Sequence, residues 1–156
     1  MSAPPDGDRP REPRDVTLRS ALAGVPLFAA LDERARGELA RCARLSNVRA
    51  GDVVIERGDP AHALFAVLRG KLKVVAPRPL GRDATLHILA PGDVFGEVAL
   101  FQEHGRTARV TALEDGLLIV LDRRDFTQLV QRESELATRV LTLMARRLHD
   151  TIAQLD

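Results

Sequence analysis

The sequence predicts a mainly β domain with helices before and after it, built as a small barrel or jelly roll. Two observations predict this fold class. Between residues 46 and 121, about eight short apolar runs are separated by turns rich in glycine, aspartate and proline, which is the spacing of a small β barrel. On both sides of this region, apolar residues recur three or four positions apart, as on the buried face of an amphipathic helix.

Length and composition narrow the class of protein. A chain of 156 residues can form one domain with a sizeable core, and a net charge of +1 gives no electrostatic reason to expect binding to nucleic acid or membrane. Because Trp and Tyr are absent, a single-strand binder that stacks bases on aromatic rings is disfavoured. The single cysteine, Cys42, cannot form an internal disulfide and is expected as a small core residue on a helix. Without a signal peptide or an apolar run long enough to cross a bilayer, a cytoplasmic location is predicted.

The N-terminal region is predicted to be a tail followed by short helices. Residues 1–15 hold four of the nine prolines and mixed charge, which predicts a disordered tail, with a docking segment as the alternative. Residues 17–23 are predicted to form a short helix and residues 25–28 an extended apolar bridge. Asp32 is the expected N-cap of a helix over residues 33–45.

The middle of the chain, from about residue 46 to about residue 121, is predicted to form the barrel. Each expected strand is an apolar run bounded by turn residues such as Gly51 and Asp52. Lys71 and Lys73 alternate with the apolar residues of one run, which predicts a strand with one outward face. The first strand is expected at Val48, and the others cover residues 53–55, 63–68, 72–75, 85–89, 110–113 and 117–121, with a hairpin tip at 77–81.

The C-terminal region returns to helical periodicity. Asp122 is the expected N-cap of a helix that carries Phe126, and residues 133–155 are expected to form a long amphipathic helix. One apolar stripe of this helix would cover the barrel: Leu136, Val140, Met144, Leu148, Ile152 and Leu155. A second stripe has partly heptad spacing: Leu141, Met144, Leu148 and Leu155. The second stripe could face another copy of the chain, so a homodimer is a hypothesis.

The stretch from residue 91 to residue 110 carries the candidate ligand chemistry. It predicts a strand end, a tight turn at Gly96, a short helix and a return into a strand, and glycine lets backbone N–H groups approach a ligand. Glu97 offers an acceptor for sugar hydroxyls, whereas Arg106 offers a planar, permanently charged fork for a phosphate. A carboxylate and a guanidinium on one ordered loop suit a ligand that carries both a ribose and a phosphate.

These residues also carry a family resemblance. Phe-Gly-Glu-Val-Ala-Leu at 95–100, followed by Arg-Thr-Ala-Arg-Val at 106–110, resembles the phosphate-binding cassette of cyclic nucleotide-binding domains, as found in catabolite activator proteins, kinase regulatory subunits and nucleotide-gated channels. The resemblance covers roughly residues 18–155. It implies a domain over residues 16–156 whose eight-stranded jelly-roll barrel, or double-stranded β-helix, has helices before it and two C-terminal helices at about 122–155.

The resemblance implies roles for single residues. Arg106 would bind the cyclic phosphate and Glu97 the ribose 2′-hydroxyl. Thr107 would hydrogen-bond to the phosphate or to the amino side of a syn guanine, so cAMP and cGMP both remain open. The other implied ligand-binding residues are Gly96, Val98, Ala99 and Ala108 in the cassette, Val74 and Leu86 as apolar walls beside the base, and Arg147 and Thr151 on the last helix.

For several of these residues an ordinary structural role explains the pattern equally well. Val74 and Leu86 fit a barrel core, and Arg147 with Thr151 fits a solvated helix face. His87 lies next to Leu86 but is set aside, because a strand histidine is more often a packed residue than a ligand. No counterpart of an aromatic cap over the base is found, which leaves the choice of base open.

The leading interpretation is a non-catalytic sensor in which a hinge near residues 121–126 lets the C-terminal helices move as a lid and signal to an unknown protein partner. One alternative is the sensor half of a transcription regulator; because the sequence ends at Asp156, no recognition helix and no DNA partner are expected. Another is a ligand-free interaction module of the same fold. An enzyme with a cupin-like metal site is not expected, because the four histidines are scattered and no His-x-His pair occurs.

Overall fold

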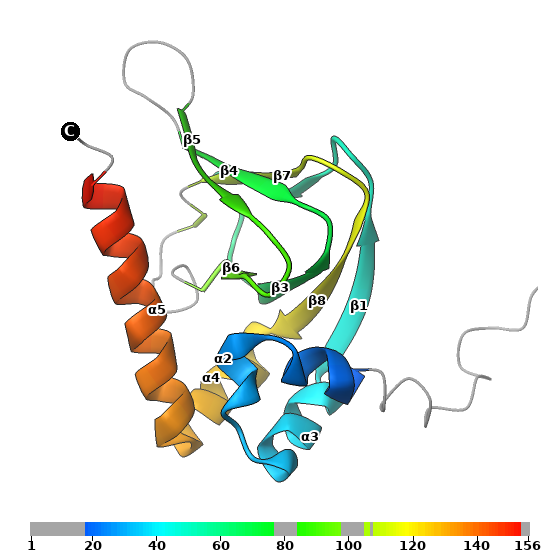
Figure 1. Ribbon diagram of the computed structural model, residues 1–156, viewed down its shortest axis with the longest axis vertical. Helices are drawn as coiled ribbons and strands as arrows, with labels where there is room; N and C mark the ends of the chain where they lie inside the picture. Colours follow the sequence, from blue (N-terminus) through cyan, green and yellow to red (C-terminus); the bar gives the residue numbers. More distant parts are fainter. Residues whose placement is uncertain (1–17, 77–83, 98–104, 107, 154–156) are drawn as a thin grey trace, which may run out of the picture.

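The computed structural model describes residues 18–76, 84–97, 105–106 and 108–153. In this part of the chain, the strands are β1 (Ala43–Val48), β2 (Val53–Ile55), β3 (Ala63–Arg69), β4 (Leu72–Ala76), β5 (Ala84–Leu89), β6 (Val94–Phe95), β7 (Arg109–Ala112) and β8 (Gly116–Asp122). They form two four-stranded antiparallel sheets with the orders β1-β8-β3-β6 and β2-β7-β4-β5 (Figure 1). The predicted mainly β fold with flanking helices is therefore confirmed.

Each face of the sheet β1-β8-β3-β6 packs against a different hydrophobic core. In β3, Leu64 and Ala66 point to the helices, whereas Phe65 and Val67 point between the two sheets. Successive side chains of a strand alternate between faces, so a strand buried on both sides reads as one continuous apolar run. This explains why β3 has no polar residue before its end. Inside the barrel, the rings of Phe65 and Phe95 stack with their centroids 5.0 Å apart.

The helices close one end of the barrel and then run along its side. Residues 18–23 are helical, and α2 (Pro26–Ala29), α3 (Glu33–Arg41) and α4 (Arg123–Arg132) lie together at one end of the sheets (Figure 1). From there α5 (Ser134–Ala153) rises along the side of the barrel toward β5. The last helix is thus anchored at its start, and its second half lies near the candidate ligand-binding residues.

Two predicted helix N-caps are confirmed. The Asp32 side chain accepts a hydrogen bond from the backbone N–H of Ala35 at 2.8 Å. The Asp122 side chain accepts from the N–H groups of Arg124 and Asp125 at 2.9 and 3.3 Å. Such caps satisfy backbone donors that have no partner inside the helix, so short polar residues before an apolar periodicity predict where a helix begins.

Three predictions about the N-terminal region are wrong. Residues 25–28 are not an extended bridge, because Pro26 begins α2 at a position where its fixed φ favours a helix. The next helix ends at Arg41 rather than at residue 45, because Ala43 begins a strand that pairs with β8. Cys42 is therefore the C-cap of α3 and is exposed, not a core residue within the helix. Long-range strand pairing overrides the local helical pattern here.

The predicted inward stripe of α5 is correct only in its first half. Leu136 and Val140 are buried, and Met144 is partly buried against the same core. Leu148 and Ile152 are 62% and 56% exposed, because α5 has by then passed the layer formed by the other helices. Leu141 is 67% exposed as well. The homodimer stays a prediction.

Some predictions fall outside the described residues. These are the N-terminal tail at 1–15, the hairpin tip at 77–81, the short helix of the cassette and the last residues of the chain, Leu155 included. The domain limits at 16 and 156 stay predictions.

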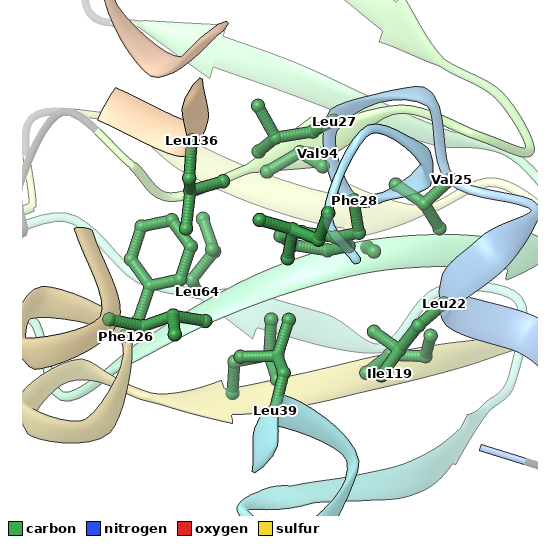
Figure 2. Close-up of a cluster of buried hydrophobic side chains, with 14 of the residues drawn as sticks. Leu22, Val25, Leu27, Phe28, Leu39, Leu64, Val94, Ile119, Phe126 and Leu136 are labelled. Atoms are coloured by element: carbon green, nitrogen blue, oxygen red, sulfur yellow. The ribbon is translucent and has the colours of Figure 1, made fainter. Parts of the chain in front are cut away.

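The helical end of the barrel is held by a buried cluster in which Phe126 takes a central place. Figure 2 shows its ring beside Leu136 and Leu64, and it meets the ring of Phe28 edge-on with centroids 6.2 Å apart. Phe126 is fully buried. Phe126→Ala is expected to lower the free energy of unfolding by about 4 kcal/mol, because it removes apolar contact and leaves a cavity. Urea denaturation measures this.

The control for this prediction is Leu113→Ala. Leu113 is 45% exposed and is expected to change stability by less than about 0.5 kcal/mol. Equal losses from the two substitutions would contradict the assigned role of the Phe126 cluster.

Candidate functional site

Two charged side chains are buried in the described part of the chain, and both come from the stretch that the sequence singled out. Glu97 is 1% exposed and Arg106 is 8% exposed. Burying a charge is unfavourable unless it is paired or hydrogen-bonded, so buried charges mark places where the surroundings, or a ligand, compensate them. Glu97 follows β6, and Arg106 lies shortly before β7.

Arg106 is fixed through both its backbone and its side chain. Its N–H donates to the carbonyl of Asp59 at 2.8 Å, and its carbonyl accepts from the N–H of Gly58 at 2.8 Å. The guanidinium donates from Nη1 to the carbonyl of Gly96 at 2.7 Å and from Nη2 to the carbonyl of Ala63 at 2.5 Å. Two of its five N–H donors therefore hold the start of the cassette and the start of β3 together.

Electrostatics make Arg106 a receptive site for an anion. Burial lowers the pKa of its guanidinium below the ordinary arginine value, and the positive charge of Arg123 acts in the same direction, while Glu97 and Asp59 oppose the change. An arginine stays protonated at physiological pH, so the group is a partly desolvated cation. An added anion would compensate that charge, as a phosphate does.

Gly96 permits the close approach of Arg106 to the chain. Its φ of 86° lies in the left-handed region that residues with a side chain rarely adopt. A Cβ atom on Gly96 would also lie 3.0 Å from Arg106 Nη1. The backbone conformation favours glycine and the contact leaves little room for a Cβ atom, so the predicted turn at Gly96 is confirmed, together with a packing reason that the sequence did not give.

Glu97 is bound by an arginine of the last helix. Nη1 of Arg147 pairs with Glu97 Oε1, and Nη2 of the same guanidinium donates to the carbonyl of Val94. The Arg147 side chain is only 22% exposed. The second carboxylate oxygen, Oε2, is buried and has no hydrogen-bond partner among the described residues. An unpartnered buried oxygen beside a paired one is suited to accept from a hydroxyl group of a ligand.

A cavity of 570 Å³ lies between β5 and the second half of α5. His87 and Leu89 line it from the strand, and Arg147, Asp150 and Thr151 line it from the helix. This volume is within the range of small-molecule sites. Thr151 is exposed and its hydroxyl donates to the carbonyl of Arg147 at 2.8 Å, within the helix.

The remaining predicted site residues are placed as follows. Val74 is 9% exposed and belongs to the core between the two sheets, against which Ala108 packs. Of the others, Val98, Ala99 and Thr107 lie outside the described residues, as does the side chain of Leu86. The structure thus brings together the predicted residues Arg106 with Gly96 and Arg147 with Glu97, through a hydrogen bond and an ion pair at adjacent positions of the cassette.

His87 belongs to the cavity although sequence reasoning set it aside. It is directly opposite Val74 across the β4–β5 pair, and opposite residues of an antiparallel pair project from the same face. The available signal was the two-residue spacing between His87 and the apolar Leu89, which puts both side chains on the same face of the strand. That signal placed the histidine on the face of the barrel interior rather than on the outer face.

In the described part of the chain, no helix is both long and apolar enough to cross a membrane. Within the same residues, no group of three or more His, Cys, Asp or Glu side chains is arranged to hold a metal ion.

Comparison with protein families matches residues 45–133 to the model of the cyclic nucleotide-binding domain. The cyclic AMP receptor protein of Thermus thermophilus is 36% identical over 106 residues, covering 68% of this chain and 49% of that protein. The regulatory subunit of cAMP-dependent protein kinase from Dictyostelium discoideum is 31% identical over 111 residues, covering 69% and 34% of the two chains.

Among solved structures, the catabolite activator protein of Thermus thermophilus superposes with a TM-score of 0.73 at 32% identity, over 84% of this chain and 62% of that one. The chain spans about half the length of the receptor protein and about a third of the kinase subunit. The family match covers more than half of the 156 residues and includes the buried Glu97 and Arg106. This chain belongs to the family of cyclic nucleotide-binding domains.

Proposed function

We propose that this chain is a non-catalytic sensor that binds a cyclic nucleotide, with cAMP as the first candidate, and passes the signal on through α5. The observation that carries the proposal is the burial of two opposite charges, Glu97 and Arg106, at 1% and 8% exposure on one short stretch. Glu97 also keeps one buried oxygen without a hydrogen-bond partner among the described residues, which a ligand hydroxyl could use. We also infer that the frame of the site is an eight-stranded jelly roll, which the two four-stranded sheets support.

Each part of the ligand has a candidate partner. The cyclic phosphate would meet the guanidinium of Arg106 and the backbone that follows Gly96, with Thr107 beside it. The ribose 2′-hydroxyl would donate to the unpartnered oxygen of Glu97. The base would enter the cavity between β5 and α5, which Thr151 lines, with Val74 across from His87 on the neighbouring strand. The names of the Thermus receptor and the Dictyostelium kinase subunit favour cAMP over cGMP.

The proposed output is the position of α5. Arg147 ties this helix to Glu97 and to the carbonyl of Val94, so it reaches the group that would hold the sugar. A ligand changes the balance between two helix positions only by binding one of them more tightly. A ribose hydroxyl on the unpartnered oxygen of Glu97 would bind the same carboxylate that holds Arg147, and would therefore favour the helix position in which this carboxylate is in place.

Isothermal titration calorimetry tests the proposal directly. We expect cAMP to bind at sub-millimolar concentration and 5′-AMP, which lacks the cyclic diester, to bind at least about tenfold more weakly. cGMP in the same series identifies the preferred base. If neither cyclic nucleotide binds, the sensor proposal is wrong, and the ligand-free interaction module becomes the better account.

A further inference from the structure

A histidine lies at the contact between the barrel and α5. His87 comes from β5, is partly buried, and lines the cavity of 570 Å³ on the side opposite Arg147 and Asp150. Val74 stands directly across from it on β4. The positions of these groups place an imidazole where the base of the ligand is proposed to bind and where the mobile helix is proposed to close.

We propose that His87 is the pH-sensitive residue of this cavity, and that its neutral form favours the packing of α5 while its protonated form weakens it. The consequence for nucleotide affinity rests on the function proposed above. The consequence for α5 does not, because it concerns the protein without ligand.

The charges that face His87 come from several elements. On α5 they are Arg146, Arg147 and Asp150, which line the same cavity. Asp93, in the turn before β6, also lines it. Glu97, which follows β6, acts on the histidine as well, and β4 contributes the apolar Val74.

Two of the acidic groups near His87, Glu97 and Asp93, already have ion-pair or hydrogen-bond partners. Glu97 is paired with Arg147, and the Asp93 carboxylate accepts from the N–H of Ala90 at 2.8 Å. The guanidinium of Arg147, held by Glu97 and Val94, remains a fixed positive charge near the ring. A protonated His87 would therefore add a positive charge near that of Arg147 in a partly desolvated space.

The direction of the titration agrees with this geometry. Burial lowers the pKa of His87, the charge of Arg147 lowers it further, and Glu97, Asp93 and Asp150 act in the opposite direction. When α5 moves away, the ring becomes hydrated and its pKa returns toward the ordinary value of about 6.5. The packed state then binds fewer protons than the released state. The contribution of neutral His87 to the packing of α5 is therefore fully present above about pH 7. It decreases as the pH falls through and below the ordinary pKa of a histidine.

The first experiment uses the protein without ligand. NMR titration from about pH 8 to about pH 5 follows the His87 ring and the backbone amides of residues 143–151. We expect the amides of α5 to shift with the midpoint of His87, which lies below the ordinary value. His149, an exposed histidine of α5, lies within this window, so the titration is run in the His149→Gln background, where the response should be retained. Adding His87→Gln should abolish it, and a response that persists in the double variant would overturn the proposal.

The second experiment measures cAMP affinity at about pH 7.5 and about pH 5.5. For the wild-type chain and His149→Gln we expect affinity to fall about threefold or more at the lower pH, and for His87→Gln to change less than that. Equal changes in all three proteins would overturn the inference for the ligand. If cAMP fails to bind at either pH while α5 still follows His87, the proposed function fails and the inference about α5 stands.

Discussion

Arg106→Ala is expected to weaken cyclic nucleotide binding by at least about 100-fold. A hydrogen bond to a charged group contributes about 1.5–3 kcal/mol, and a fork-shaped guanidinium can supply two to a phosphate. The substitution also leaves the carbonyls of Gly96 and Ala63 without their donor. The cassette would then lose a tie to β3 as well as the cation. Calorimetry with cAMP gives the affinity, and a thermal melt shows whether the fold survives.

Two further variants separate charge from geometry. Arg106→Lys keeps the positive charge but loses the planar fork, so it should recover only part of the affinity. The matched control is Arg109→Ala, three residues along the chain. Arg109 makes an ion pair with Glu56 at 2.9 Å in which both side chains are at least 40% exposed, so water screens the pair and its loss should change cAMP affinity little. If Arg106→Ala binds cAMP as tightly as Arg109→Ala, the phosphate assignment is wrong.

Glu97→Gln is expected to lower nucleotide affinity by about 10- to 100-fold and to loosen α5. The amide keeps the shape of the side chain but loses the negative charge that pairs with Arg147. Removing one partner of a fully buried ion pair costs about 3–5 kcal/mol, and the 22% exposure of the Arg147 side chain reduces this to about 2 kcal/mol. The ribose hydroxyl would also lose its charged acceptor. Chemical denaturation and calorimetry measure the two effects.

A double-mutant cycle isolates the contact between the cassette and the helix. Glu97→Gln, Arg147→Met and the double variant should give a coupling energy of at least about 1 kcal/mol in the free protein. Glu135→Gln is the control on α5, because Glu135 forms an exposed pair with Arg139 at 3.5 Å. Additive effects of Glu97→Gln and Arg147→Met would contradict a tie between α5 and the ligand site.

Much of the fold could be predicted because its signals are local. Asp32 and Asp122 precede helices whose free N–H groups they satisfy, and the apolar runs of β3 and β8 are strands with two buried faces. The start of β1 could not be predicted in this way. Residues 43–45 continue a helical pattern, and only the pairing of Ala43 with Leu121, far along the chain, makes them a strand.

The candidate site likewise has a part that could be predicted from the sequence and a part that could not. By itself, the amino-acid sequence determined the family, the turn at Gly96 and the pair of opposite charges at Glu97 and Arg106, because these residues lie within one short stretch whose chemistry can be seen without the fold. Only the tertiary structure decided that Arg147 reaches Glu97 and that His87 faces α5. These contacts join residues about 50 or more positions apart in the chain. Their partners are set by how the barrel and the last helix pack, and no local pattern of residues records that arrangement.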